Sequence, residues 1–240
     1  MIRQKSTVIA HRGASSLAPE NTASAISQAL ELGADWVEVD CRLTRDGTWV
    51  LIHDSHIDRR SQGRGRVEAL TLDELRQYEF GAWFDPAFEG EPILTLGEAC
   101  DLVLPKASLI LDIKTKADPG LIARTLARAL AGRDPEKILL SSFSIAVLHR
   151  LRKLPTPFLL GCLFKRQPVW RTWLAGRLGL YSIHPHRSVF SRDLARRAHA
   201  QGMKVFVWTV NRAADMTETA RQGADGFFTD FPQRARRVPA

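Results

Sequence analysis

Two acidic residues stand two positions apart in an apolar run, at Glu38 and Asp40 within residues 36–40. If this run is a strand, its two-residue period aims both carboxylates at one face and the alternate apolar residues at the other. Buried carboxylates repel unless a cation, a proton or a basic group compensates, and a hard divalent cation with oxygen ligands is the simplest solution. A salt bridge to Arg42 or Arg45 explains the spacing equally well, so both interpretations stay open.

A basic tripeptide, His11-Arg12-Gly13, follows the first apolar run of the chain. Histidine transfers protons near neutral pH, arginine grips phosphate oxygens with two parallel donors, and glycine lets the backbone approach a ligand closely. Alone the tripeptide is a weak signal, because an exposed loop with an incidental histidine has the same composition. Taken alone, the incidental histidine is the better interpretation.

Acid and base again share one face at Asp112 and Lys114, at the end of another apolar run. They could form a structural ion pair. In the functional interpretation Asp112 completes a carboxylate metal site and Lys114 holds a phosphate.

A hairpin signal brings a second histidine into range. The dipeptide Asp46-Gly47 separates two strand-like runs, and antiparallel pairing across it places His53 about opposite Asp40. The sequence therefore predicts a histidine beside the acidic strand end.

Strand-like runs alternate with segments of helical periodicity, which favours a parallel sheet with crossover helices. Helix starts are marked by capping patterns at Thr71 with Glu74 and at Thr95 with Glu98, and further helices are expected after Asn21 and Asp118. Eight strands, the number that closes a barrel, are predicted at Thr7–Ala10, Trp36–Asp40, Leu109–Ile113, Ile138–Phe143, Phe158–Leu163, Leu180–Ile183, Val205–Val210 and Gly226–Thr229.

Composition and charge narrow the class of protein. The 240 residues carry a net charge of +8, which favours an anionic partner such as a phosphorylated metabolite, a phospholipid surface or nucleic acid. Cys41, Cys100 and Cys162 are odd in number and far apart, as expected of reduced core residues in the cytoplasm. No leader peptide and no apolar run of about 18 residues is predicted.

Five motifs match one family in order and spacing. They are His11-Arg12-Gly13, Glu20-Asn21-Thr22, Glu38-Val39-Asp40, His53-Asp54 and the Trp208–Asn211 segment. The chain resembles the glycerophosphodiester phosphodiesterases over nearly its whole length. The resemblance implies a single (β/α)8 TIM-barrel domain over residues 1–240, with a β-hairpin and a small insertion, at about 54–92, after the second barrel strand.

The resemblance also implies roles for eight residues. Mg2+ or Ca2+ would bind to three acidic residues, the phosphate and the rest of the substrate would contact three others, and two histidines would be the general acid and base. The metal set is Glu38, Asp40 and Asp112; the substrate set is Arg12, Lys114 and Trp208; the catalytic pair is His11 and His53. The family usually has Glu where this chain has Asp112. Three consequences of the shorter side chain stay open: the metal moves inward, a water bridges Asp112 to it, or the site binds metal more weakly.

The expected reaction is hydrolysis of glycerophosphodiesters to sn-glycerol 3-phosphate and an alcohol, without a nucleic-acid partner. One alternative is hydrolysis of lysophospholipids at a membrane surface, suggested by the basic, tryptophan-bearing segment 164–178, although a barrel helix packed on its sheet shows the same apolar stripe. Another is a non-catalytic binder of phosphate esters or nucleic acid.

Two further histidines, His184 and His186, flank Pro185. An ordinary loop position explains them at least as well as a place in the pocket wall, so they are left out of the catalytic set. The oligomeric state stays open.

Overall fold

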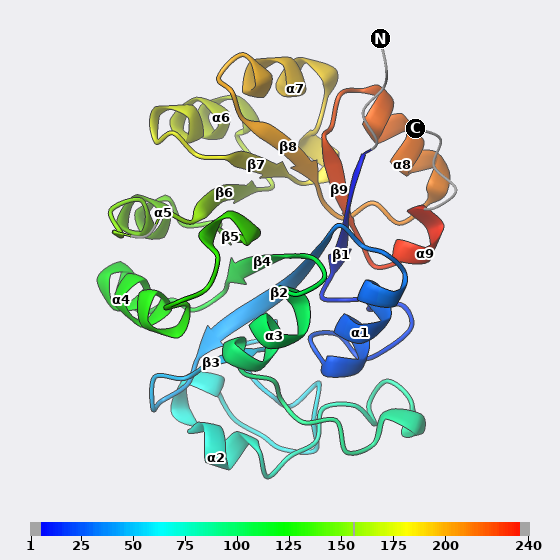
Figure 1. Cartoon of the computed structure of the whole chain (residues 1–240), viewed down its shortest axis with the longest axis vertical. Coiled ribbons are helices and arrows are strands. Elements are labelled where there is room, and N and C mark those ends of the chain that lie inside the picture. The colour runs from blue at the N-terminus through cyan, green and yellow to red at the C-terminus, as the bar shows by residue number, and fades with distance from the viewer. Residues whose placement is uncertain (1–5, 156, 236–240) are drawn as a thin grey trace.

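A closed barrel of parallel strands forms the centre of the molecule in this computed structural model, which describes residues 6–155 and 157–235 (Figure 1). Within these ranges the parallel strands pair in the order β1-β9-β8-β7-β6-β5-β4-β2, and β1 pairs with β2 to close the circle. Their bounds are β1 Thr7–His11, β2 Trp36–Leu43, β4 Ser108–Ile113, β5 Ile138–Ser142, β6 Leu159–Phe164, β7 Ser182–Pro185, β8 Lys204–Val207 and β9 Gly226–Thr229. The predicted (β/α)8 barrel is confirmed.

Helices surround this barrel on its outside (Figure 1). They are α1 Ala23–Glu31, α3 Leu96–Val103, α4 Pro119–Ala129, α5 Ile145–Leu151, α6 Pro168–Arg177, α7 Arg192–His199, α8 Ala213–Arg221 and α9 Pro232–Ala235. The short helix α2 Leu72–Leu75 lies away from the barrel, in the segment between β3 and α3. The 3-10 turns are η1 Val67–Ala69, η2 Pro86–Phe88, η3 Pro135–Lys137 and η4 Arg187–Val189. None of the helices in the described ranges has the length and apolar character needed to cross a bilayer.

Helix starts follow the predicted capping chemistry at most positions. Both capping boxes form, at Thr71 with Glu74 and at Thr95 with Glu98, and Asp118 caps α4. The exception is α1, which is capped by Thr22 rather than by Asn21. The Asn21 side chain is engaged elsewhere, because its amide oxygen accepts from the Asp40 backbone N–H at 2.9 Å.

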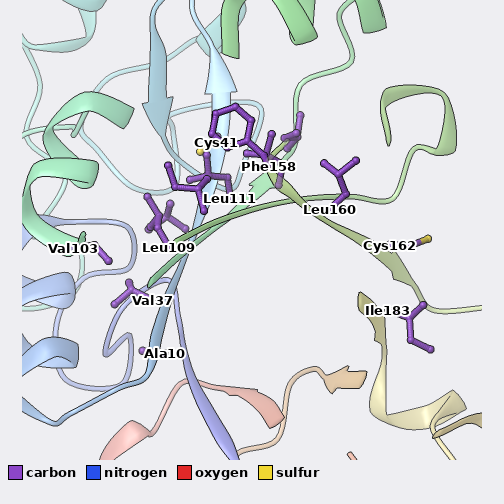
Figure 2. Close-up of a cluster of buried hydrophobic side chains, with 14 of the residues drawn as sticks. Ala10, Val37, Cys41, Val103, Leu109, Leu111, Phe158, Leu160, Cys162 and Ile183 are labelled. Carbon is purple, nitrogen blue, oxygen red and sulfur yellow. The ribbon is translucent and has the colours of Figure 1, made fainter. Parts of the chain in front are cut away.

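Strand alternation divides the barrel into an outer and an inner set of side chains. The outer set packs beneath the helices; Figure 2 shows part of it, including Val37, Cys41, Leu109, Leu111, Leu160 and Cys162. All three cysteines are free and buried. The inner set fills the barrel with the apolar side chains of Ile9, Ile110, Leu139, Phe206 and Phe228. Each such side chain contributes roughly 1.5–3 kcal/mol through burial, so the apolar layers hold the strand ends in place.

The predicted hairpin forms between β2 and β3 (Trp49–Leu51), one residue out of the expected register. Thr44 N–H donates to Thr48 O at 2.9 Å, so the loop holds three residues with Gly47 in a left-handed conformation (φ 79°). A three-residue loop ending in a left-handed glycine is a common alternative to the two-residue turn assumed from Asp46-Gly47. As a result Ile52, not His53, bonds to Asp40 O, at 3.0 Å.

Two strand predictions were displaced, the first of them because the polar side chains of Ser182 and His184 lie inside the barrel. The sixth barrel strand, β7, runs over Ser182–Pro185 instead of Leu180–Ile183, and His184 is fully buried rather than part of a loop. The seventh, β8, ends at Val207, three residues before the predicted end. Hydrophobic patterning underestimates strands whose inward positions carry polar side chains.

The segment between β3 and α3 has an apolar cluster of its own. Val50, Ile52, Ile57, Val67, Leu75, Phe80 and Ile93 form it, and short turns and α2 connect them. This region lies at the foot of the view in Figure 1.

Candidate active site

Polar side chains replace the inner apolar layer where β1, β2 and β4 reach their carboxyl ends. The register pairs His11 with Glu38, and Asp40 with Asp112, on neighbouring strands. The exposed fractions of Glu38, Asp40 and Asp112 are only 3%, 1% and 5%. Each of these three residues offers a carboxylate oxygen within 4.8 Å of the others. Active sites of barrel enzymes lie at this end of the strands.

A cavity of about 280 Å³ opens above these carboxylates. Seven of the eight predicted site residues line it; the exception is Asp40, which is almost fully buried. The lining set is His11, Arg12, Glu38, His53, Asp112, Lys114 and Trp208, joined by the aromatic rings of Phe143 and Phe228. The structure therefore brings the predicted residues together, although they come from distant parts of the chain.

Asp40 is the most strongly compensated of the three acids. Its carboxylate lies 2.8 Å from Arg12 Nε and 3.2 Å from Lys114 Nζ, and it accepts from Asn21 Nδ2 at 3.2 Å. Burial alone would raise its pKa, but the two cations outweigh that effect and hold the pKa well below its usual range. Asp40 is therefore ionised at neutral pH.

The other two acids show the opposite shift. Burial, reinforced by repulsion from Asp40, raises the pKa of Glu38 to about 7. Burial also raises the pKa of Asp112, although Lys114 Nζ at 2.5 Å opposes that shift. Asp112 Oδ1 is buried without a hydrogen-bond partner among the residues described. Carboxylates that repel one another around an unsatisfied oxygen fit a divalent cation.

His11 is held by a residue 219 positions away in the sequence. Its Nδ1 lies 2.6 Å from Asp230 Oδ1, and Asp230 Oδ2 in turn accepts from Asn211 Nδ2 at 2.7 Å. Burial lowers the pKa of His11, but Glu38 and Asp230 outweigh burial and the net pKa is raised. No role was predicted for Asp230; its signal in the sequence was an acid directly after the last apolar strand.

His53 has a partner directly beside it in the chain. Its Nδ1 lies 2.9 Å from Asp54 Oδ1, and 37% of its side chain is exposed. Its backbone carbonyl accepts from Arg42 Nε at 2.9 Å and from Arg42 Nη2 at 2.7 Å. Arg45 pairs with Glu74 at 3.0 Å. The arginines weighed as salt-bridge partners for Glu38 and Asp40 therefore have other partners.

Arg12 leaves the strand end through a turn that only glycine completes. Gly13 has φ 80°, and a Cβ atom there would lie 2.6 Å from the Ala25 carbonyl carbon. The Arg12 side chain reaches Glu20 at 3.1 Å as well as Asp40, and Glu20 also pairs with Arg60 at 3.2 Å. Arg12 is thus fixed at the cavity edge by two carboxylates.

Aromatic rings form another part of the cavity wall. Phe143 and Trp208 meet edge to face at 5.7 Å between ring centroids, and His186 meets Trp208 at 4.8 Å. Trp208 Nε1 donates to His184 O at 2.8 Å, which fixes the indole. Phe143 was not predicted as a site residue, because a phenylalanine at a strand end looks like any core residue.

Comparison with known proteins identifies related sequences and structures. The sequence model of the glycerophosphoryl diester phosphodiesterase family matches residues 11–234. A glycerophosphodiester phosphodiesterase of Caldanaerobacter subterraneus subsp. tengcongensis is 36% identical over 233 residues, which cover 95% of this chain and 96% of the relative. A structure of a phosphodiesterase from Oleispira antarctica, in complex with the product sn-glycerol-3-phosphate, matches with a TM-score of 0.91 and 30% identity, covering 97% of this chain and 96% of that one.

Proposed function

Because this chain belongs to the glycerophosphoryl diester phosphodiesterase family, we propose that it hydrolyses glycerophosphodiesters to sn-glycerol 3-phosphate and an alcohol. The observation that carries the proposal is one cavity holding two histidines and two basic side chains beside three buried carboxylates. The family and its named enzymes favour a catalyst over a non-catalytic binder. The product bound to the Oleispira antarctica enzyme is the one expected here.

Glu38, Asp40 and Asp112 would hold the divalent cation, and we propose Mg2+ or Ca2+ because all three ligands are carboxylates. When bound, the cation supplies positive charge that offsets charge building on the phosphate oxygens. Arg12 and Lys114 add to this on the side of the cavity that they line. Trp208 would bound the space for the substrate.

His11 and His53 are proposed as the general acid and base. One imidazole takes the proton of the attacking hydroxyl or water, and the other gives a proton to the departing alkoxide as the phosphorus–oxygen bond breaks. In both histidines Nδ1 is engaged by an aspartate, Asp230 or Asp54, which orients the ring.

The test is a product assay with and without a chelator. Purified protein is expected to release sn-glycerol 3-phosphate from glycerophosphocholine, to lose this activity in chelator, and to regain it with Mg2+ or Ca2+. His149→Ala, on the exposed face of α5, serves as a histidine control for His11→Ala and His53→Ala. Turnover that survives chelation would contradict the metal assignment.

A second candidate, hydrolysis of lysophospholipids at a membrane surface, is favoured by helix α6. Its Val169, Trp170 and Trp173 side chains are 57%, 51% and 54% exposed, while Thr172 and Ala175 face the barrel. Exposed tryptophans among basic residues are typical of helices that lie in a bilayer interface. Arg171 Nη1 donates to Phe143 O at 3.0 Å, so this helix adjoins the cavity wall.

Sedimentation with anionic and with uncharged liposomes tests the membrane contact. Trp170→Ala and Trp173→Ala are each expected to weaken binding to anionic liposomes, and Trp83→Ala, which removes a partly exposed tryptophan elsewhere, is the control. Negligible binding of the unmodified protein, or equal binding of all three variants, would remove this candidate.

We further propose a cytoplasmic location and a single domain with residues 54–92 as its insertion. The first rests on three buried free cysteines, which suit a reducing compartment. The second is supported by the separate apolar cluster in which four residues of that segment, Ile57, Val67, Leu75 and Phe80, pack with Val50, Ile52 and Ile93 at its base.

A further inference from the structure

The guanidinium group of Arg42 joins the ends of two different strands to β2. Arg42 follows Asp40 by two residues, so both side chains leave the same face of β2. Its Nε and Nη2 both donate to the carbonyl of His53, at 2.9 and 2.7 Å, and its Nη1 donates to the carbonyl of Lys114 at 3.2 Å. One rigid plane therefore holds two backbone oxygens.

Both of these carbonyls lie beyond regular strand pairing. His53 is two residues past the end of β3, and Lys114 is one residue past the end of β4. The ladder contributes one last hydrogen bond near each end, from Ile52 N–H to Asp40 O and from Lys114 N–H to Cys41 O, both at 3.0 Å. The Arg42 side chain adds three hydrogen bonds, which tie the residues after β3 and β4 to β2.

We propose that Arg42 is a positioning residue, which sets the His53 imidazole and the Lys114 ammonium at a fixed separation across the cavity. The inference rests on the proposed roles of His53 and Lys114. Arg42 acts through backbone geometry, because its donors go to neutral carbonyls that only the planar guanidinium can bridge. Misplacing a catalytic group by about 1 Å costs on the order of 100-fold in rate.

The experiment compares Arg42→Met with Arg45→Met, which removes an exposed arginine from the same hairpin. Arg42→Met is expected to lower kcat by about 100-fold relative to Arg45→Met while KM changes by less than about fivefold. Arg42→Lys is expected to recover part of the loss, because an ammonium group reaches one carbonyl but not both. A general loss of stability would instead lower the folded fraction and leave kcat per folded molecule unchanged.

A kcat for folded Arg42→Met within twofold of Arg45→Met would overturn the inference, as would an Arg42→Lys variant no more active than Arg42→Met. If Arg42→Met does not fold, Arg42→Lys and Arg45→Lys are compared, and equal kcat values overturn it. His53→Ala in the same assay separates the two proposals. Full turnover by His53→Ala would refute the acid–base role, whereas the Arg42 and Arg45 pairs decide the positioning role.

Discussion

His11 and His184 both lie inside the barrel, one at its carboxyl end and one in the apolar layer below. His184 is fully buried, with its ring 5.2 Å from that of Phe228 and 5.7 Å from that of Phe206, and burial lowers its pKa to about 3. His11, with 17% of its side chain exposed, lies beside Glu38 and Asp230, which raise its pKa in spite of burial. The charged form of an imidazole is therefore stabilised at the carboxyl end of the barrel and destabilised in the barrel interior.

The largest expected difference between the two histidines is in turnover. His11→Ala should lower the rate of sn-glycerol 3-phosphate release by about 1,000-fold, the scale of general acid–base catalysis. His184→Gln, which keeps the size and a donor, should change the rate by less than about tenfold because the side chain does not line the cavity and the carbonyl that holds Trp208 is retained. Single-turnover measurement compares them, and equal losses would mean that the interior layer takes part in the chemistry.

Asp230→Asn probes why the pKa of His11 is raised. Removing this carboxylate takes away one of the charges that raise the pKa of His11, so the limb of the pH–rate profile that reports His11 should move to lower pH. Loss of the orienting partner should also lower kcat by about 10- to 100-fold.

The matched control for that variant is Asp225→Asn, whose carboxylate binds His199 Nε2 at 2.8 Å, outside the cavity. It should leave both the pH profile and kcat unchanged. An unshifted profile in Asp230→Asn would show that Glu38 alone supports the protonated form of His11.

The low pKa of His184 predicts a pH-dependent stability. Below pH 6.5 the imidazole of His184 is protonated in the unfolded chain, whereas in the folded chain it stays neutral down to about pH 3. The free energy of unfolding therefore falls as pH is lowered from 6.5 to about 3. At pH 5 the loss should reach about 2 kcal/mol, since one pKa unit corresponds to about 1.4 kcal/mol. Urea unfolding at pH 7.5 and pH 5 measures it. His184→Gln should lack this component, and an identical pH dependence in both proteins would contradict it.

The smallest effect concerns two serine–histidine pairs of similar geometry. Ser182 Oγ lies 2.8 Å from His184 Nε2 inside the barrel, and Ser188 Oγ lies 2.7 Å from His186 Nδ1 at the surface. His184 Nδ1 already has no partner among the described side chains and backbone, so Ser182→Ala should cost about 1–2 kcal/mol of unfolding free energy. Ser188→Ala should cost less than about 0.5 kcal/mol, because water replaces the lost bond. Equal costs would show that the interior pair is hydrated.

Much of the site followed from local pattern. The two-residue period put Glu38 and Asp40 on one face of a strand, and the family resemblance placed His11, Asp112 and Lys114 beside them. The physical basis is that parallel strands bring their carboxyl ends to one edge of the barrel. Capping boxes were predicted correctly because their hydrogen bonds lie within four residues. These features depend on short-range geometry, which the order of residues specifies directly.

Tertiary structure decided what depends on distant partners. Asp230, at the end of the last strand, became the partner of His11 on the first strand. Arg42 bonds to two backbone carbonyls rather than to Glu38 or Asp40, because those carbonyls lie just past the ends of β3 and β4. Burial decided the protonation of His184, which in the sequence resembled a loop histidine. The residue order determined which groups reach the barrel's carboxyl end; only barrel closure determined which neighbours each group meets, and hence its charge.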